Sequence, residues 1–283
     1  MSAWETQALG GTPGGGSWFW WGRRLRFTPM AQVTQSRPPV TGTAATPRKR
    51  RKFFLLDLYS TAVGKKYAMA ITGIMLIGFV LAHMIGNLKM YLGAEDINHY
   101  GEFLRELLVP LLPRTVALWL MRFGLIAAVG VHIHAAYGLT IINRHARSVK
   151  YQGPRDYQVA NFASRTMRWT GIIVFLFVFW HLADLTWGWW NAVGNDGKFV
   201  RGDIYGNVVR SFERVPVAVV YILANIALGF HLFHGVWSLF QSMGWNNPRF
   251  KAWRRYLAVG IATMIVVGNV SFPLAVLAGI VGE

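Results

Sequence analysis

The chain is 283 residues long, 53% of its residues are hydrophobic, and its formal net charge is +17. Its charged residues are gathered into blocks between long uncharged runs, which argues against a soluble domain, where charge is scattered along every helix. Because the chain has no cysteine, it cannot form disulfides or supply the thiolate ligands of an iron–sulfur cluster.

Residues 1–56 are expected to form a flexible, basic cytoplasmic extension. Residues 1–46 are rich in Gly, Thr, Pro and Ser and lack the continuous apolar segment of a signal peptide. The run PRKRRK at residues 47–52 has the composition of a nucleic-acid patch. Its position just before an apolar segment favours a topology anchor or a contact with lipid headgroups instead, so we expect no nucleic-acid partner.

Five runs come near the roughly 20 apolar residues that are needed to cross a bilayer core. They cover residues 67–88, 119–141, 169–190, 217–240 and 256–280. The sequence therefore predicts an all-α integral membrane protein, with residues 57–283 forming one bundle of five transmembrane helices. Lys and Arg are concentrated before the first span and in the second and fourth loops, which predicts a cytoplasmic N-terminus.

The loops between these spans differ in character. The first loop, residues 89–118, contains two prolines and an amphipathic patch around His99 to Leu108, which predicts a short helix on the outer surface. The third loop, residues 191–216, is polar and contains glycine, and the fourth is short and basic. No period of 20 to 50 residues indicates a repeat architecture.

Six of the eight histidines lie within the predicted spans: His83, His132, His134, His181, His231 and His234. Ionisable side chains at that depth are costly and usually mark a pathway or a bound group. For a single histidine, an interhelical hydrogen bond explains the position equally well. Histidines in four of the five spans favour a bound metal cofactor.

Depth in the membrane suggests how the histidines pair. His132 and His231 lie 13 and 14 residues into spans that enter from outside, so they are level, towards the cytoplasmic side. His83 and His181 lie 16 and 12 residues into spans that enter from inside, which places both towards the outer half. Level histidines on different helices are what a low-spin haem needs, so the sequence predicts two b haems stacked across the membrane.

Three further polar residues lie inside the spans. His234 shares a helix face with His231 and is expected to bind a propionate, a quinone or a neighbouring helix. His134 points away from His132 and is expected to face another helix. Asp184 shares a face with His181, and a hydrogen bond to an imidazole, to Thr186 or to a nearby Trp, or a role in proton transfer, is favoured over metal ligation.

Four segments carry a resemblance to a known family: HMIGNLKMY (83–91), HIHAAYGLTIINRHAR (132–147), SRTMRWTG with FWHLADLT (164–171 and 179–186), and HLFHGVWSLFQSMG (231–244). Residues 57–280 resemble the cytochrome b membrane-anchor subunit of succinate dehydrogenase and fumarate reductase, respiratory complex II, in its single-chain, five-helix form. The resemblance implies four axial haem ligands, with the first span paired with the third and the second with the fourth. The matching positions are His83, His132, His181 and His231.

The resemblance also implies a function and partners. It implies electron transfer between a membrane quinone and a flavoprotein and an iron–sulfur protein docked on the cytoplasmic face of a bacterial-type inner membrane. The chain would then be the non-flavin anchor of a succinate:quinone oxidoreductase, unable to oxidise succinate alone, in a complex that can form a higher oligomer. The additional residues His134, Asp184 and His234 leave open a non-haem iron or iron–sulfur centre with His and Asp ligands.

Candidate partners for the quinone headgroup lie near the predicted cytoplasmic boundary, and each also fits a helix-end or interface anchor: Ser60, Lys65, Trp237, Ser238 and Gln241. Two other functions compete with the respiratory anchor. One is a free-standing transmembrane b-type cytochrome. The other is a transporter in which histidines and Asp184 relay protons, which would favour inverted repeats or broken helices that the sequence does not show.

Overall fold

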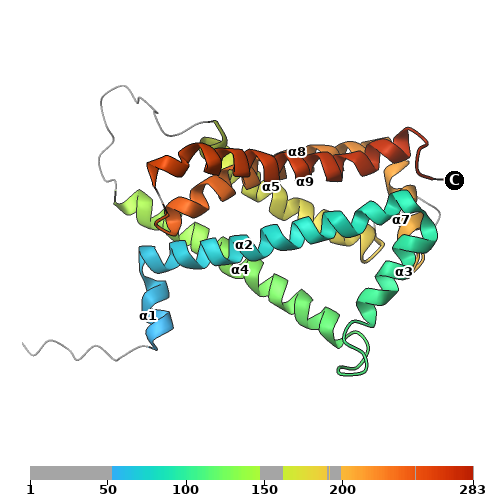
Figure 1. Ribbon diagram of the computed structural model, residues 1–283, viewed down its shortest axis with the longest axis horizontal. Coiled ribbons are helices and arrows are strands. Elements are labelled where there is room, and N and C mark those ends of the chain that lie inside the picture. Colours follow the sequence, from blue (N-terminus) through green and yellow to red (C-terminus); the bar gives the residue numbers. More distant parts are fainter. Residues whose placement is uncertain (1–52, 147–161, 190, 192–198, 246, 283) are drawn as a thin grey trace, which may run out of the picture. The chain divides into compact units, whose positions relative to one another are not determined.

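The computed structural model describes residues 53–146, 162–189, 191, 199–245 and 247–282. The predicted extension, residues 1–56, therefore lies almost entirely outside the described residues. Within the described ranges the chain is helical and contains no β-strand. The elements lie along the chain as a bundle of long helices with short helices at its two ends (Figure 1).

Five helices are long and apolar enough to cross a membrane: α2 (Ala62–Asn87), α4 (Val116–His145), α5 (Phe162–Leu185), α8 (Val215–Ser242) and α9 (Lys251–Leu277). The prediction of an all-α, five-span membrane protein is thus confirmed. Helix α5 ends earlier than the predicted residue 190, and Gly188, three residues beyond its end, has a left-handed backbone (φ 74°) that a helix cannot pass through.

Short helices close both ends of the bundle: α1 (Phe54–Ser60), η1 (Leu88–Leu92), α3 (Ala94–Arg105), α7 (Ile204–Phe212) and η2 (Pro248–Phe250). The end with α1 is called the inner end here and the end with α3 and α7 the outer end, following the predicted orientation. The amphipathic patch predicted around His99 to Leu108 corresponds to α3, which begins and ends earlier. Helices α1 and α7 were not predicted.

The corner between α1 and α2 is set by two residues. Thr61 is extended (φ −81°, ψ 158°), and its side chain accepts a hydrogen bond from the Gly64 N–H at 2.9 Å, which caps α2. A Cβ at Gly64 would lie 1.9 Å from the Leu58 carbonyl oxygen, so only glycine fits at this position. As a result α1 turns away from the axis of α2 (Figure 1).

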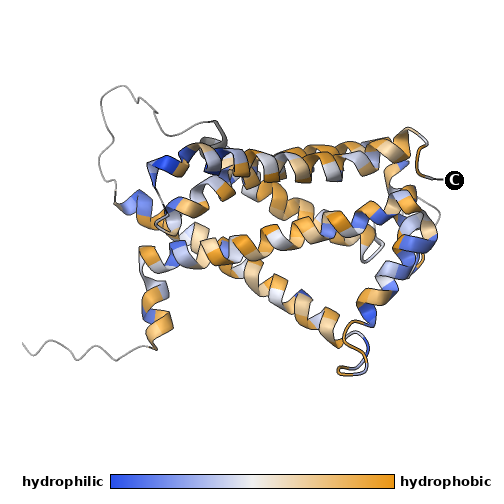
Figure 2. Ribbon diagram, in the orientation of Figure 1, coloured by the Kyte–Doolittle hydropathy of each residue, from blue (hydrophilic) through white to orange (hydrophobic). Residues whose placement is uncertain are grey.

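The long helices pack in pairs. Helix α2 lies against α4, α5 lies against α8, and α9 packs along α8, with additional contacts from α2 to α8 and α9. Small residues permit the close approaches, since a Cβ at Gly229 would lie 2.4 Å from Val266 and one at Gly268 would lie 2.3 Å from the Met84 sulfur. Apolar residues cover the middle of the long helices, whereas polar residues gather towards the two ends (Figure 2).

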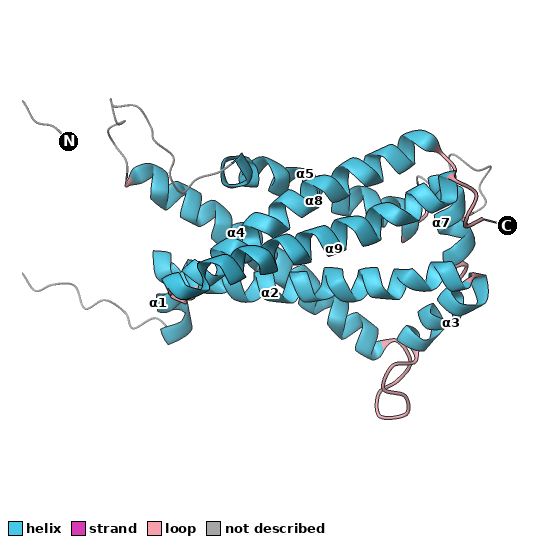
Figure 3. Ribbon diagram, turned by 45° about the horizontal axis from the view of Figure 1, so that its top comes forward, coloured by secondary structure: helices cyan, strands magenta, loops and turns pink. Residues whose placement is uncertain are grey.

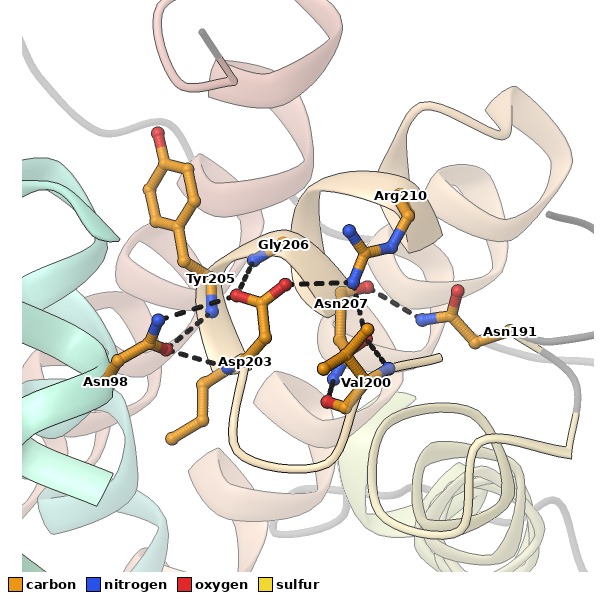
Figure 4. A network of polar contacts seen from close by, with 9 residues as sticks. Asn98, Asn191, Val200, Asp203, Tyr205, Gly206, Asn207 and Arg210 are labelled. Atoms are coloured by element: carbon orange, nitrogen blue, oxygen red, sulfur yellow. Dashed lines mark hydrogen bonds and ion pairs between the residues drawn. The ribbon is translucent and has the colours of Figure 1, made fainter. Parts of the chain in front are cut away.

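Helices α3 and α7 lie together at the outer end (Figure 3). The Asn98 side chain of α3 accepts hydrogen bonds from the backbone N–H groups of Ile204 (2.7 Å) and Tyr205 (3.1 Å), which otherwise lack partners at the start of α7. Asp203 caps the same helix through the Gly206 N–H at 2.9 Å (Figure 4). The two loops of the outer surface are therefore joined by polar contacts.

Candidate functional site

The first histidine pair joins α2 and α5 towards the outer end. The imidazole rings of His83 and His181 have centroids 5.9 Å apart and planes at 81°. Phe79 stacks on His83, and Phe177 lies against His181, so each ring has a phenylalanine one turn before it. The first and third spans therefore meet through these two rings, and their role as a ligand pair stays a prediction.

This separation is that of an edge-to-face ring contact, and it is compatible with one metal atom that lies about 2 Å from a nitrogen of each ring. The Nδ1 atom of His181 is buried and has no hydrogen-bond partner among the described residues. A buried imidazole that lacks a polar partner is suited to using a ring nitrogen as a metal ligand.

The second pair joins α4 and α8 towards the inner end. His132 lies on α4 and His231 on α8, and their pairing stays a prediction from their level depths in the spans. Glycines on the neighbouring helices face the two rings: a Cβ at Gly73 would lie 3.6 Å from His132 Cε1, and one at Gly171 would lie 3.3 Å from His231 Cε1. Each imidazole of this pair thus packs against a glycine of the partner helix.

Both inner imidazoles also meet a threonine. The Thr72 hydroxyl oxygen of α2 lies 3.1 Å from His132 Nδ1, and the Thr170 hydroxyl oxygen of α5 lies 3.5 Å from His231 Nδ1. Thr72 precedes His83 by eleven residues, as Thr170 precedes His181. At 1.5 Å rise per residue, the two histidine pairs are therefore about 16 Å apart along the helices.

Asp184 is fully buried beside the outer pair. Its carboxylate accepts hydrogen bonds from Tyr221 (2.9 Å), from Ser211 and from Arg214 (2.9 Å), which belong to α7, α8 and the turn between them. The Tyr221 ring packs edgewise on His181 at 5.9 Å. The favoured structural role is consistent with these contacts, but the expected partners, an imidazole, Thr186 or a tryptophan, are replaced by these three residues.

A polar cluster lies at the inner end, two residues beyond His132. The Tyr59 hydroxyl of α1 is hydrogen-bonded to His134 Nδ1 at 2.6 Å, so His134 faces another helix as expected. The Lys65 ammonium donates to the backbone carbonyls of Tyr59 (2.9 Å) and Ser60 (3.1 Å). A Cβ at Gly138 would lie 2.9 Å from Lys65 Cε, so this lysine lies directly against α4.

The remaining quinone candidates lie on another helix, on the last two turns of α8. Trp237 stacks with the guanidinium of Arg254 at 5.9 Å, and the Ser238 hydroxyl donates to the Gly235 carbonyl at 3.1 Å. Gln241 is exposed. The structure thus brings Ser60 and Lys65 together and leaves Trp237, Ser238 and Gln241 as a separate group.

The alternative ligands of a non-haem centre do not come together. His134 pairs with Tyr59, Asp184 binds Ser211, Arg214 and Tyr221, and His234 lies one turn beyond His231 on α8. In the part of the chain that the structure describes, no three His, Cys, Asp or Glu side chains form a group that could hold a metal ion. The level histidine pairs are the arrangement that the described residues offer.

Sequence reasoning missed several residues of the site: Tyr59, Thr72, Thr170, Ser211, Arg214 and Tyr221. A signal for the threonines was present, because Met69–His83 and Met167–His181 share the pattern M-x-x-T-G-I-x4-F-V-x2-H. These two segments are offset by 98 residues, which is longer than the period of 20 to 50 residues that marks a repeat architecture. No comparable sequence signal marks the partners of Asp184.

The described residues thus define an all-helical protein with five helices that are long and apolar enough to cross a membrane, and the rings of His83 and His181 contact each other within it. A family model described as "Succinate dehydrogenase/Fumarate reductase transmembrane subunit" matches residues 140–270, which include His181 and His231. The chain is also 27% identical over 195 residues to the "Succinate dehydrogenase cytochrome b558 subunit" of Bacillus subtilis (strain 168), covering 69% of this chain and 81% of that protein. No solved structure gave a significant match. Together, these findings support a complex II membrane anchor.

Proposed function

We propose that the chain is the cytochrome b anchor of a succinate:quinone oxidoreductase and holds two b haems. His83 and His181 would hold the outer haem, and His132 and His231 the inner one. The observation that carries the proposal is the ring geometry of His83 and His181, with centroids 5.9 Å apart. The name of the Bacillus subtilis relative, a cytochrome b558 subunit, also supports haem as the bound group.

When bound, each haem supplies a one-electron carrier. The residues of the chain fix where these carriers lie, because the two histidine pairs belong to rigid helices and are about 16 Å apart. Phe79 and Phe177 orient the outer rings through aromatic contact. Gly73 and Gly171 leave the space that the inner rings need.

Quinone is proposed to bind at the inner end, beside Tyr59, Lys65 and His134. Reduction of a quinone to a quinol consumes two electrons and two protons, so its site needs proton donors near a redox centre. Such donors are Tyr59, His134 and the Lys65 ammonium. His134 lies two residues after His132 on α4. The Ser60 carbonyl accepts from Lys65 in this cluster, whereas the candidates Trp237, Ser238 and Gln241 lie on α8.

The partners are proposed to be a flavoprotein subunit and an iron–sulfur subunit on the cytoplasmic face of a bacterial inner membrane. The chain lacks cysteine, so the clusters that feed the haems must come from another polypeptide. Exposed cations at the inner end, Arg249, Lys251 and Arg255, offer a docking surface for such a partner. This anchor alone does not oxidise succinate.

The test is a series of His→Ala variants in the complex purified through a tag on this chain. The outer haem should disappear in the His83 and His181 variants and the inner haem in the His132 and His231 variants, as measured by reduced-minus-oxidised spectra and extracted haem. His99→Ala is the control, because His99 is exposed on α3. Equal haem loss in the control would contradict the assignment. Purification without flavin and iron–sulfur subunits would indicate a free-standing cytochrome.

A further inference from the structure

The two halves of the bundle repeat one arrangement around the inner histidines. The segments Met69–His83 and Met167–His181 share a methionine, a Thr-Gly pair and a histidine at the same spacing. The partner helices share the pattern A-x-G-x-H, at Ala128–His132 and Ala227–His231. Helices α2 and α4 thus correspond to α5 and α8, and each half places its threonine beside the inner histidine of its second helix.

The hydroxyl proton of each threonine is directed at its own helix. Thr72 donates to the Ala68 carbonyl at 2.7 Å, and Thr170 donates to the Met167 carbonyl at 3.0 Å. With the proton committed there, the hydroxyl oxygen has lone pairs available and lies towards the imidazole Nδ1 of the neighbouring helix. The threonine oxygen can therefore accept a hydrogen bond from the histidine.

This contact fixes the tautomer of the imidazole. A neutral imidazole carries one N–H, and an acceptor beside Nδ1 places that N–H there. The lone pair of Nε2 is then left for a metal, as in other sites where a hydrogen bond to the far nitrogen fixes a histidine ligand.

We propose that Thr72 and Thr170 are positioning residues of the inner centre, which hold His132 and His231 as Nδ1–H tautomers so that Nε2 binds the iron. The inference rests on the proposed function, since it takes the inner centre to be a haem. It reaches beyond that function because it assigns a role to two residues outside the four ligands.

The outer pair provides the internal comparison. His181 Nδ1 has no hydrogen-bond partner among the described residues, although the same two helices carry the threonines eleven residues earlier. Threonines that bond back to their own helix are common in membrane spans, and Thr140 of α4 does so through the Ala136 carbonyl at 2.9 Å. Contact with a histidine across the helix pair is what separates Thr72 and Thr170 from Thr140.

The test is a redox titration with electron paramagnetic resonance of the intact complex carrying Thr72→Val, Thr170→Val or Thr140→Val. Valine keeps the shape and removes the acceptor. Loss of the acceptor makes the imidazole a weaker donor to ferric iron, so the inner haem should become easier to reduce. A tenfold effect, the lower end seen for such outer-shell groups, corresponds to a rise of about 59 mV for one electron.

Thr72→Ser and Thr170→Ser keep the hydroxyl and should restore the potential and the resonance of the inner haem. The outer haem and the Thr140→Val variant should be unchanged. Unchanged inner potentials in both valine variants, or an equal shift in Thr140→Val, would overturn the positioning role while leaving the two-haem function intact. A wild-type complex without haem would overturn the proposed function itself, and this inference with it.

Discussion

The inner and outer histidine pairs are supported by different contacts, although both lie on the same repeated helices. At the inner end the support is polar, through Thr72 and Thr170. At the outer end it is aromatic, through Phe79 and Phe177, one turn before His83 and His181. In both cases the supporting residues recur at an offset of 98 residues. The two halves therefore have the same residue types at the positions next to the proposed cofactors.

The two halves differ where they meet the short helices α3 and α7 of the outer end. Three residues after His83 stands Gly86, whose open side is filled by the Tyr100 ring of α3. Three residues after His181, at the corresponding position, stands Asp184, whose carboxylate is bonded to Ser211, Arg214 and Tyr221. The same position is thus packed by an aromatic ring in the first half and takes part in a buried ion pair in the second half. The ring comes from α3, and the arginine of the ion pair comes from the turn between α7 and α8.

The largest effect is expected for Asp184→Ala, because it leaves the partly buried Arg214 without its carboxylate. Removing one member of a buried ion pair costs about 3–5 kcal/mol of stability. The outer haem should be lost before the inner one, since Tyr221 packs on His181. Thermal unfolding of the purified complex, followed with the spectrum of each haem, measures this. Equal loss of both haems would show that the network has no special link to the outer centre.

A smaller loss is expected for Gly86→Ala. The new Cβ would lie 2.7 Å from Tyr100 Cε1, so the ring must shift, and overpacking of this kind costs about 1–3 kcal/mol. Gly78→Ala on the same helix is the matched control, because nothing lies within 4 Å of a Cβ there. Melting temperatures of the two variants give the comparison. A Gly78 variant as unstable as the Gly86 variant would refute the packing explanation.

The inner glycines offer a finer comparison between the halves. A Cβ at residue 171 would lie 3.3 Å from His231 Cε1, which is tight, whereas one at residue 73 would lie 3.6 Å from His132 Cε1, which is ordinary contact. Gly171→Ala should therefore shift the inner haem resonance, and Gly73→Ala should leave it nearly unchanged. Low-temperature paramagnetic resonance spectra distinguish the two. The reverse order would contradict the placement of these rings.

The smallest effect is expected for the stability of α7 at low pH, through Asp203. Partial burial by itself raises the pKa of Asp203, but hydrogen bonds from Gly206, Arg210 and Asn98 and the charge of Arg210 hold the pKa below its ordinary value of 3.8. Because the folded pKa is the lower one, the stabilisation is complete above the unfolded pKa and is lost as the pH falls through the folded pKa. The protection of α7 against hydrogen exchange, relative to an unfolded peptide at the same pH, should fall below about pH 4. Asp203→Asn should weaken this pH dependence, and an unchanged profile would contradict the assignment.

The spans followed from the sequence because they depend on a local pattern, apolar length. The contact between the His83 and His181 rings agrees with the pairing that residue depth predicted, and the pairing of His132 with His231 stays a prediction. The partners of Asp184 did not follow from the sequence, because they lie 27 to 37 residues further along the chain and are brought to it by the packing of α7 and α8. Helix α7 was missed because a polar, glycine-containing loop gives little helical signal, and it is capped by Asn98 from a distant loop. The orientation of the N-terminus stays a prediction.

The contacts of His134 and of the two threonines also depend on how the helices pack, which the sequence does not show. The sequence predicted that His134 faces another helix. Its contact with Tyr59 could not be predicted, because it depends on the turn between α1 and α2, which Thr61 and Gly64 set. The threonine contacts could have been found, because the repeated segments are visible in the sequence once an offset near 98 residues is considered. What the pattern alone could not show is that the repeated threonines meet histidines on the neighbouring helices.

The most direct test of the central claim is the ratio of b haem to this chain in the wild-type complex, from extracted haem and quantified protein. Two level histidine pairs predict two haems per chain, with two separate reduction steps in a redox titration. A complex that reduces quinone with no haem would contradict the account, and a ratio of one would show that one of the two pairs serves another purpose.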